Sequence, residues 1–461
     1  MKKGSWILIL AVAAVLPASS DAQWARAYGG KDYDDAASIQ PVPGGGFILI
    51  GTTSAVDQWG FPVSEIWVVR LANSGAILWQ KRMYSEYGYS GSNGYGVQTT
   101  RDNRFILMGR VSCRSYGGRG DLSAVKLDGH GNPSWQAFVA DPAYPNQHKW
   151  SGGHSVQQTW DGGYIMTGYQ VYHNMLKDSS IDRDLLIFKT NSLGNMKCGG
   201  AFGGPGDETG NSIQETPDGG FIVAGQTNSF GAGLDDAWVL KFRKDYTLEW
   251  SSTYGGRDID QAREIRRTPD GGYIVAGLTK SFGAGSYDLW LLKLDKRGSI
   301  LWQKTYGGPK ADYGHSVHPT ADGGFIVAGT TASFGSGISD GWVLKLNARG
   351  SVLWEKTYGG SAYDGLFCVR PLGKGGYIAA GKTRSFGAGD NDALVLKLGK
   401  NGNIDKSCGL FVRASEADVR TGGGRAEWKA GEGGCGYIVW GGKPILPWAF
   451  TKAANAVICM K

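Results

Sequence analysis

The sequence lacks the motifs by which many enzymes and metal sites are recognised. It contains no HExxH metalloprotease motif and no Walker loop, and neither a GxSxG nucleophile elbow nor a GxGxxG dinucleotide loop in a strand–helix setting. Its six cysteines form no CxxC or Cys/His ligand pattern. We therefore assign no catalytic residue, no metal ligand and no cofactor, although carboxylates from distant segments could still form a catalytic pair that spacing does not reveal.

Strong charge imbalance and long apolar runs are also missing. The chain carries 48 basic against 41 acidic residues, without the clustered Lys and Arg of a nucleic-acid-binding surface. The apolar N-terminal run, residues 6–16, is too short to span a membrane. It follows Lys2 and Lys3 and precedes the small-residue segment 20–22, which is typical of a cleaved secretory signal. We expect a mature chain that begins near Gln23 and is secreted, periplasmic or at the cell surface.

Glycine and aromatic residues are abundant instead, with 75 Gly, 17 Trp and 21 Tyr, which implies many turns and a large aromatic core. The segments Trp250–Trp302 and Trp302–Trp354 repeat each other at a period of 52 residues (302 − 250 and 354 − 302). Each contains four short runs rich in β-branched and aromatic residues, with no helical periodicity. Four such runs predict one antiparallel sheet, which must stack on copies of itself to bury both faces.

Seven copies of this unit can be counted from their second strands. These are residues 47–53, 105–111, 164–170, 221–227, 273–279, 325–331 and 377–383. Seven four-stranded sheets suit a closed ring, which protects the sheet edges. The segment Trp24–Gly30 matches the fourth strand of a unit, whereas the last unit lacks its fourth strand after Ile404. We therefore predict an all-β, seven-bladed β-propeller of four-stranded antiparallel blades, with the ring closed by the N-terminal strand.

The recurring runs also resemble a known family. DGGFIVAGQTNSFGAG (218–233) and DGWVLKLNARGSVLWEKTYGG (340–360) are similar to the seven-bladed β-propeller repeats of secreted bacterial and archaeal proteins. The resemblance covers about residues 23–407. It implies a propeller and an extracytoplasmic location but no particular reaction, because this fold hosts unrelated functions. We divide the chain into a signal peptide (1–22), the propeller (23–407) and a short C-terminal tail or small appendage (408–461).

The cysteines allow few assignments. Cys198 stands in unit 3 where a Trp usually stands, and Cys368 lies in a first strand, where it could be only a small buried side chain. Cys408 and Cys435 lie in the tail and could form a disulfide, which secretion would permit.

Charged residues recur at equivalent positions of the units. A carboxylate follows the GG pair, another precedes the third strand, and a Lys or Arg lies within that strand. The carboxylates after the GG pair include Asp34, Glu208, Asp260, Asp312 and Asp364, and those before the third strand include Asp236, Asp288, Asp340 and Asp392. The basic residues within the third strand include Lys241, Lys293, Lys345 and Lys397. One interpretation is a ring of carboxylates that holds cations. The other is that these Asp residues cap loop amides and pair with neighbouring Lys. We favour the second, because architecture explains a set carried by every blade more easily than ligand recognition does.

Two His-Ser pairs, His154-Ser155 and His315-Ser316, open equivalent first strands that should line the axis of the ring. A nucleophile and its base would have to face each other. Adjacent residues on a strand point to opposite faces, so we interpret these pairs as structural.

The loops of one face differ between the units. Meander geometry puts the connections between units and the loops from second to third strand on this face, and the tight hairpins on the other. The loops lengthen at 54–65, 139–153 and 169–184 and gain aromatic and His residues, whereas units 4 to 7 carry short copies of SFGAG. Variable loops on a rigid scaffold often carry function, and aromatic rings with a polar rim suit a sugar or a peptide. The candidate ligand-binding residues are Trp59, Phe61, Tyr144, His148, Trp150, Tyr169, Tyr172 and His173.

These observations favour a monomeric binding or scaffold module for a glycan or a protein, with no nucleic-acid partner and no membrane span. Three alternatives remain: enlarged loops that only pack their own aromatics, a propeller enzyme acting on polysaccharide, and a structural component of the cell envelope. Two carboxylates roughly 5–10 Å apart in a deep axial cleft would favour the enzyme. An aromatic patch without such a pair would favour binding.

Overall fold

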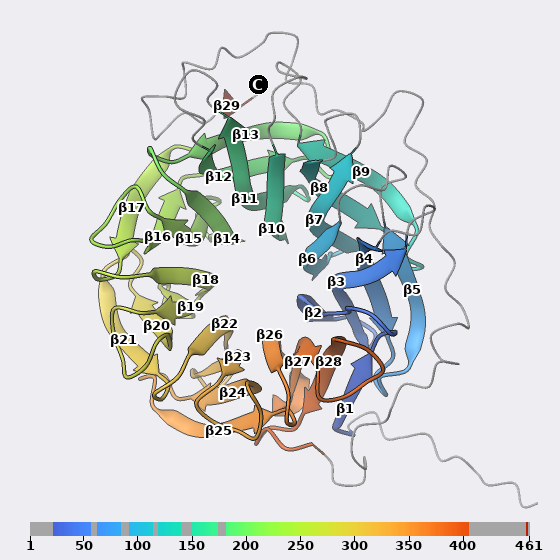
Figure 1. Cartoon of the computed structure of the whole chain (residues 1–461). Helices are drawn as coiled ribbons and strands as arrows, with labels where there is room; N and C mark the ends of the chain where they lie inside the picture. The colour runs from blue at the N-terminus through green and yellow to red at the C-terminus, as the bar shows by residue number, and fades with distance from the viewer. Residues whose placement is uncertain are drawn as a thin grey trace, which may run out of the picture.

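The computed structural model describes residues 22–56, 62–83, 92–113, 119–139, 150–173, 181–404 and 458–459. They form seven small antiparallel sheets set as blades around a central axis (Figure 1), which confirms the predicted seven-bladed β-propeller. Part of the predicted binding site, Trp59, Phe61, Tyr144 and His148, lies outside the described residues, as do Cys408 and Cys435. Within the described ranges, no helix is long and apolar enough to cross a membrane.

Each blade is a meander whose strands follow one another from the axis outward (Figure 1). Blades 1 to 3 comprise β2 (Ser38–Pro41), β3 (Phe47–Val56), β4 (Pro62–Leu71) and β5 (Ile77–Met83); β6 (Asn93–Thr99), β7 (Phe105–Cys113), β8 (Arg119–Leu127) and β9 (Pro133–Val139); and β10 (Trp150–Gln158), β11 (Tyr164–His173), β12 (Ile181–Thr190) and β13 (Met196–Phe202), to which β29 (Ile458–Cys459) is added.

Blades 4 to 7 follow the same plan. They comprise β14 (Glu208–Glu215), β15 (Phe221–Thr227), β16 (Asp236–Phe242) and β17 (Leu248–Tyr254); β18 (Asp260–Arg267), β19 (Tyr273–Thr279), β20 (Asp288–Leu294) and β21 (Ile300–Tyr306); β22 (Asp312–Pro319), β23 (Phe325–Thr331), β24 (Asp340–Leu346) and β25 (Val352–Tyr358); and β26 (Asp364–Pro371), β27 (Tyr377–Thr383) and β28 (Asp392–Leu398) with β1 (Trp24–Tyr28). In blade 7 a 3-10 turn, η2 (Gly373–Gly375), replaces the tight turn between β26 and β27.

Tight hairpins join the first and second strands of the blades. In blade 6 the Thr320 amide donates to the carbonyl of Gly324 at 2.9 Å, and the Gly323 amide donates back to the carbonyl of Thr320 at 3.0 Å. Gly323 has a φ of 78°, a conformation that glycine adopts without steric cost. The Asp-Gly-Gly pattern of the repeats therefore fixes the hairpin and the register of the two strands.

The hydrophobic core lies between neighbouring blades. In blade 6, Phe325, Val327 and Leu344 pack against blade 5, whereas Ile326 and Val343 pack against blade 7. Alternate residues of one strand are therefore buried on opposite faces of the sheet, which is why the second and third strands are continuous apolar runs. The stacking predicted from the repeat is confirmed.

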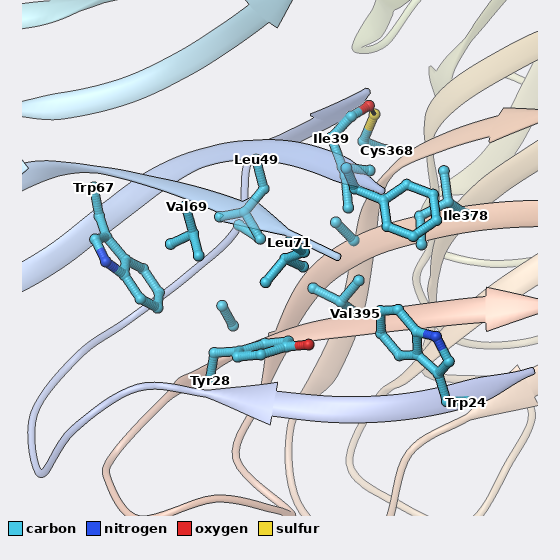
Figure 2. Close-up of a cluster of buried hydrophobic side chains, with 14 residues drawn as sticks. Trp24, Tyr28, Ile39, Leu49, Trp67, Val69, Leu71, Cys368, Ile378 and Val395 are labelled. Atoms are coloured by element: carbon cyan, nitrogen blue, oxygen red, sulfur yellow. Dashed lines mark hydrogen bonds between the residues drawn. The ribbon is translucent and has the colours of Figure 1, made fainter. Parts of the chain in front are cut away.

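The ring is closed by the N-terminal strand, as the sequence predicted. Strand β1 forms the outer strand of blade 7 and pairs with β28 in a register that sets Trp24 opposite Lys397 and Tyr28 opposite Ala393. Trp24 and Tyr28 also pack against β3 and β4 of blade 1 (Figure 2), in a cluster that includes Leu49. The first strand of the chain thus joins the last blade to the first.

The recurring carboxylates serve the architecture. Asp312 accepts a hydrogen bond from the Gly308 amide at 2.8 Å, and Asp340 accepts from two amides of the loop before its strand at 2.9 and 3.1 Å. The capping interpretation is confirmed, but the partner of Lys345 is Asp322 of the first hairpin, with Nζ and Oδ2 2.8 Å apart. Among the described residues, no group of three His, Cys, Asp or Glu is placed to hold a metal ion.

Candidate functional site: the axial channel and its aromatic mouth

The first strand of every blade lines the axis of the ring. These strands begin at the face formed by the connections between blades, which we call the loop face, and end at the hairpins of the opposite face, the hairpin face. They enclose an axial cavity of about 130 Å³ that is lined by residues of all seven blades. A cavity to which every repeat contributes is the natural place to compare the repeats.

A β-bulge gives the first strands of blades 2 to 7 two consecutive residues that line the cavity. In blade 6 the register shifts between Gly314 and Ser316, so His315 is paired with no residue in the register of β22 with β23. Both His315 and Ser316 line the cavity, so our expectation that adjacent residues point to opposite faces is wrong at this position. The bulge is the reason, because it interrupts the alternation of an ordinary strand.

The lining residues form three tiers. The upper tier, nearest the loop face, consists of the bulged residues and their equivalent in blade 1: Ala37, Tyr95, His154, Asn211, Arg263, His315 and Phe367. The middle tier has a serine in four blades and differs in three: Ser38, Ser155, Ser212 and Ser316, then Gly96, Glu264 and Cys368. The lower tier, nearest the hairpin face, has glutamine in blades 1 to 4 and charged or imidazole groups elsewhere. Gln40, Gln98, Gln157, Arg266 and Arg370 line the cavity, and Gln214 and His318 occupy the equivalent strand positions of blades 4 and 6.

Most polar side chains of the lower two tiers bind the backbone of the next blade. Gln157 accepts a hydrogen bond from the Glu215 amide at 2.6 Å, and Gln214 accepts from the Arg267 amide at 2.9 Å. Ser316 accepts from the Val369 amide at 3.1 Å. Since these bonds satisfy backbone donors at the blade interfaces, the Ser and Gln residues have a structural role.

Aromatic residues gather at the upper end of the channel on blades 2 and 3. The His154 ring lies between Tyr95 and Tyr169, with centroids 5.3 and 5.5 Å away. The Arg183 guanidinium lies 4.9 Å from the centre of the Tyr169 ring, at cation–π distance. Tyr95 and Tyr169 are half-buried, so each keeps part of its ring accessible. We call these four residues the mouth cluster.

A second aromatic group lies across the channel on blades 5 to 7. The rings of Tyr313 and Tyr287 are 5.5 Å apart, and His315 lies 5.3 Å from Phe367. The Lys382 ammonium is 5.9 Å from the centre of the Phe367 ring. Aromatic side chains therefore occur on both sides of the channel near the loop face, each beside a cation.

The channel histidines, His154, His315 and His318, are neutral at pH 7. Burial is the largest effect and lowers their pKa values to about 4, about 3 and about 4. Arg263 adds to the lowering of the pKa of His154 and His315, and Arg266 does so for His318. The Nδ1 atom of His154 lies 3.2 Å from the Gly210 carbonyl and 3.1 Å from the Asn211 amide oxygen, and the Nε2 atom of His315 lies 3.3 Å from the Thr330 hydroxyl. In neither His-Ser pair is the imidazole shown bound to its serine.

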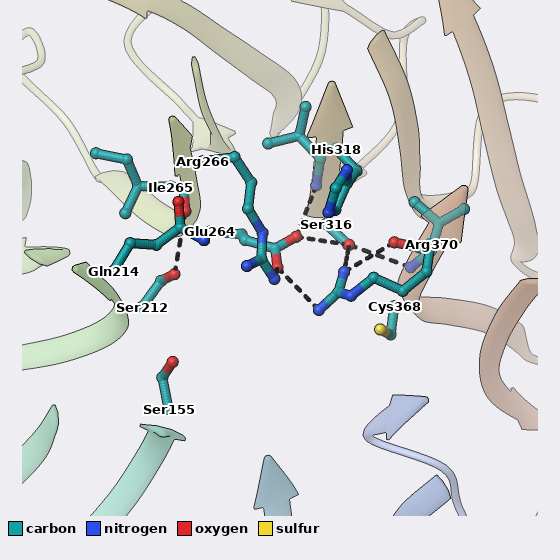
Figure 3. Close-up of polar contacts among 12 residues, drawn as sticks. Ser155, Ser212, Gln214, Glu264, Ile265, Arg266, Ser316, His318, Cys368 and Arg370 are labelled. Carbon is teal, nitrogen blue, oxygen red and sulfur yellow. Dashed lines mark hydrogen bonds and ion pairs between the residues drawn. The ribbon is translucent and has the colours of Figure 1, made fainter. Parts of the chain in front are cut away.

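A charged cluster occupies the middle and lower tiers of blades 5 to 7 (Figure 3). Glu264 forms an ion pair with Arg266 and another with Arg370, whose Nη2 lies 3.1 Å from Oε1. The Ser316 hydroxyl donates to Glu264 at 2.6 Å and the Val317 amide donates at 2.8 Å. Burial alone would raise the pKa of Glu264, but the two guanidinium groups and the Ser316 hydroxyl outweigh it and lower the pKa to about 2.

This arrangement bears on the polysaccharide-enzyme alternative. Among the described residues that line the cavity, Glu264 is the only carboxylate. A glycosidase of the usual kind needs two carboxyl groups, one of them protonated to act as the acid. Glu264 is held ionised and is fully bonded, so the described channel does not provide that pair.

The rest of the predicted binding site lies on blade 3. Strand β10 begins at Trp150 and β11 continues to His173, so Trp150, Tyr169, Tyr172 and His173 belong to paired strands and not to loops. Tyr169 packs against His154 of the channel lining in the mouth cluster. Sequence reasoning missed Tyr95, Arg183 and the charged cluster, although the first strands could have revealed the channel residues as the positions where otherwise similar repeats differ.

Comparisons with known proteins assign the chain to no family. No family model matches the chain, and no curated protein does. Among solved structures, a protein of unknown function from Dyadobacter fermentans is 11% identical, covers 81% of this chain and 97% of its own, and superposes with a TM-score of 0.44. One of unknown function from Bacteroides caccae has 13% identity, 68% and 98% coverage and a TM-score of 0.38. The Pan2 WD40 domain of Neurospora crassa is 11% identical, covers 81% of this chain and 98% of its own, and superposes with a TM-score of 0.43. Similarity at this level carries no inference about function.

Proposed function

We propose that this protein is an extracytoplasmic binding module that recognises a glycan at the loop face of blades 1 to 3. The mouth cluster is the observation that supports the proposal. It offers partly accessible Tyr faces for stacking against sugar rings, and it places the Arg183 guanidinium and the Asn211 amide nearby as hydrogen-bonding groups. A protein segment is the other ligand class that such a surface suits.

The remaining candidate residues would extend this surface. Trp150 and Tyr172 lie near the same end of blade 3 as Tyr169, since Trp150 pairs with Val171 in the β10–β11 register. We propose that the segments 54–65, 139–153 and 169–184 add further aromatic and imidazole groups around the mouth cluster. The propeller then acts as a rigid scaffold and the site draws its specificity from three neighbouring blades.

The test is a glycan-array screen of the mature chain beside two variants, Tyr169→Ala and Trp160→Ala. Trp160 is the matched control, since it is an aromatic residue of the same blade, 63% exposed, in the hairpin on the opposite face. Selective glycan binding that Tyr169→Ala loses and Trp160→Ala retains supports the proposal. Equal losses in both variants, or binding to no glycan, contradict it, and a pull-down with the same variants then tests the protein-ligand form.

The location is tested separately. We propose that residues 1–22 direct export and are removed, which predicts a mature N-terminus near Gln23 in protein recovered outside the cytoplasm. N-terminal mass spectrometry of the expressed protein gives the answer, and an intact Met1 in exported material would contradict cleavage.

A further inference from the structure

The axial cavity contains more positive than negative charge. Three arginines line it, Arg263, Arg266 and Arg370, and Glu264 is the only carboxylate among its described lining. Arg263 is exposed at the upper end of the channel, so the formal balance of the other groups, in the lower two tiers, is +2 − 1 = +1, since the channel histidines are neutral at pH 7. An excess of buried positive charge is costly unless a counter-charge is present.

Glu264 has no capacity left to supply that counter-charge. Its Oε2 accepts hydrogen bonds from the Ser316 hydroxyl and the Val317 amide at 2.6 and 2.8 Å. Its Oε1 contacts both Arg266 and Arg370 (Figure 3). Each carboxylate oxygen thus has two donors, which is about what its lone pairs accommodate.

The two arginines, in contrast, retain donors without a partner. The Nε atoms of Arg266 and Arg370 are buried and have no hydrogen-bond partner among the described residues. Arg370 is only 8% exposed. A buried guanidinium N–H without an acceptor is uncommon in native structures and points to an acceptor that protein atoms do not supply.

The space beside them is large enough for such an acceptor. The cavity of about 130 Å³ exceeds the roughly 30 Å³ that one water molecule occupies in the liquid. The Arg guanidinium is well suited to carboxylate and phosphate oxygens, which accept from it in short, charge-assisted bonds. The lower-tier glutamines of blades 2 to 4 are bound to backbone amides, so the charge in blades 5 to 7 decides what the lower channel attracts.

We propose that the lower part of the axial channel binds a small oxyanion, a carboxylate or a phosphate, at Arg266 and Arg370. The anion accepts hydrogen bonds from the Nε–H groups of the two arginines and balances the positive charge that Glu264 alone does not neutralise. The site lies below the mouth cluster, at the opposite end of the channel, and does not depend on the proposed glycan recognition.

The test measures binding of inorganic phosphate and of acetate to the mature chain by calorimetry, at ionic strength held constant with sodium chloride. We expect saturable binding near one equivalent for at least one of the two anions, and the comparison of the two arms separates phosphate from carboxylate. Arg349, which is exposed in a hairpin turn, provides the matched control. Arg349→Gln should leave binding unchanged, and Tyr169→Ala should leave it unchanged too.

Two substitutions give opposite results if the site is real. Arg370→Gln should weaken binding at least tenfold, because it removes a charge and its N–H donors. Glu264→Gln should strengthen binding by on the order of tenfold, because it removes a competing carboxylate and keeps an oxygen for Ser316. If Arg370→Gln does not fold, the variant Glu264→Ser/Arg266→Gln/Arg370→Gln adopts the residues of the other blades and should fold without binding the anion. No saturable binding to the unmodified chain, or no gain in Glu264→Gln, overturns the proposal.

Discussion

Replacing Trp24 with alanine should destabilise the whole propeller, although Trp24 lies close to the N-terminal end of the described chain. Its side chain is 4% exposed, and its Nε1 donates to the Asn73 carbonyl of blade 1 at 2.9 Å. Its ring meets Phe47 of blade 1 at a centroid distance of 6.1 Å. Strand β1 belongs to blade 7, so Trp24 holds the last blade against the first.

The size of the effect follows from the buried area. A buried Trp covers about 150–250 Å², which at ~25 cal/mol per Å² corresponds to about 4–6 kcal/mol. Residual burial in the unfolded chain reduces this to about 3–5 kcal/mol, the range found when large aromatic residues are replaced by alanine. With an unfolding entropy of roughly 2.1 cal/mol/K for each of about 380 residues, the melting temperature should fall by about 4–6 °C.

Differential scanning calorimetry of the mature chain measures the shift, with Trp302→Ala as the control. Trp302 occupies the equivalent position of blade 5 and meets Phe325 of blade 6 at the same centroid distance, 6.1 Å. If β1 closes the ring, both substitutions should lower the melting temperature. The decrease should be smaller for Trp302→Ala, because Trp302 is only half-buried. If Trp302→Ala lowers the melting temperature and Trp24→Ala leaves it within about 1 °C, β1 does not close the ring in solution and the reasoning is refuted.

Three further predictions concern other parts of the ring. Asp312→Ala should cost about 3 kcal/mol or more in chemical denaturation, because it leaves the Gly308 amide and the Thr331 hydroxyl unpaired. Lys280→Ala, which removes an ion pair with Asp258 whose two side chains are 39% and 36% exposed, should cost about 1 kcal/mol or less. The channel histidines have pKa values of about 3 to 4 when folded and about 6.5 when unfolded, so the unfolded chain binds more protons and they lower the melting temperature as the pH drops from 6.5 towards 4. Burial raises the pKa of Asp34 to about 6 and also raises the pKa of a set of other carboxyl groups, which opposes this fall; they are Asp35, Glu215, Asp236, Asp340 and Asp392. His315→Gln should therefore lose less melting temperature over this range than the unmodified chain, and an equal loss would contradict the burial of His315. The register of β13 and β29 sets Cys198 opposite Cys459, so non-reducing peptide mapping of exported protein should find these two residues in one disulfide, and finding both as thiols would contradict the pairing.

The fold was predictable because each of its determinants is local and repeated. A period of 52 residues with four short apolar runs specifies one blade, and the segment 24–30 is recognisable as a displaced fourth strand from its residues alone. The role of Asp340 was predictable for the same reason, since a residue that every copy carries at one position of its loop serves what the copies share. The structure confirms this by two loop amides bound to its Oδ2.

The candidate site was less predictable, for two physical reasons. A rule of strict alternation placed His315 and Ser316 on opposite faces of their strand, whereas the bulge after Gly314 lets both line the cavity. Bulges depend on how the strand fits against the neighbouring blades, and short sequence windows do not contain that information. The ion pairs of Glu264 are likewise formed with residues both near and far in the chain, Arg266 and Arg370, and only closure of the ring shows that the second pair is possible.

The differences between the repeats at the channel have a physical explanation. Blades 4 to 7 share nearly the same framework, yet in the middle tier Glu264 replaces the serine of its neighbours, and in the lower tier arginine replaces glutamine at 266 and 370. These changes depend on one another, because Glu264 without the guanidinium groups would be a buried, unpaired carboxylate. The framework would be served equally well by Ser and Gln, which satisfy the same backbone donors in the other blades. A charged set that the architecture does not require, and that leaves two Nε–H groups unused, is better explained by something that enters the channel than by the stability of the ring.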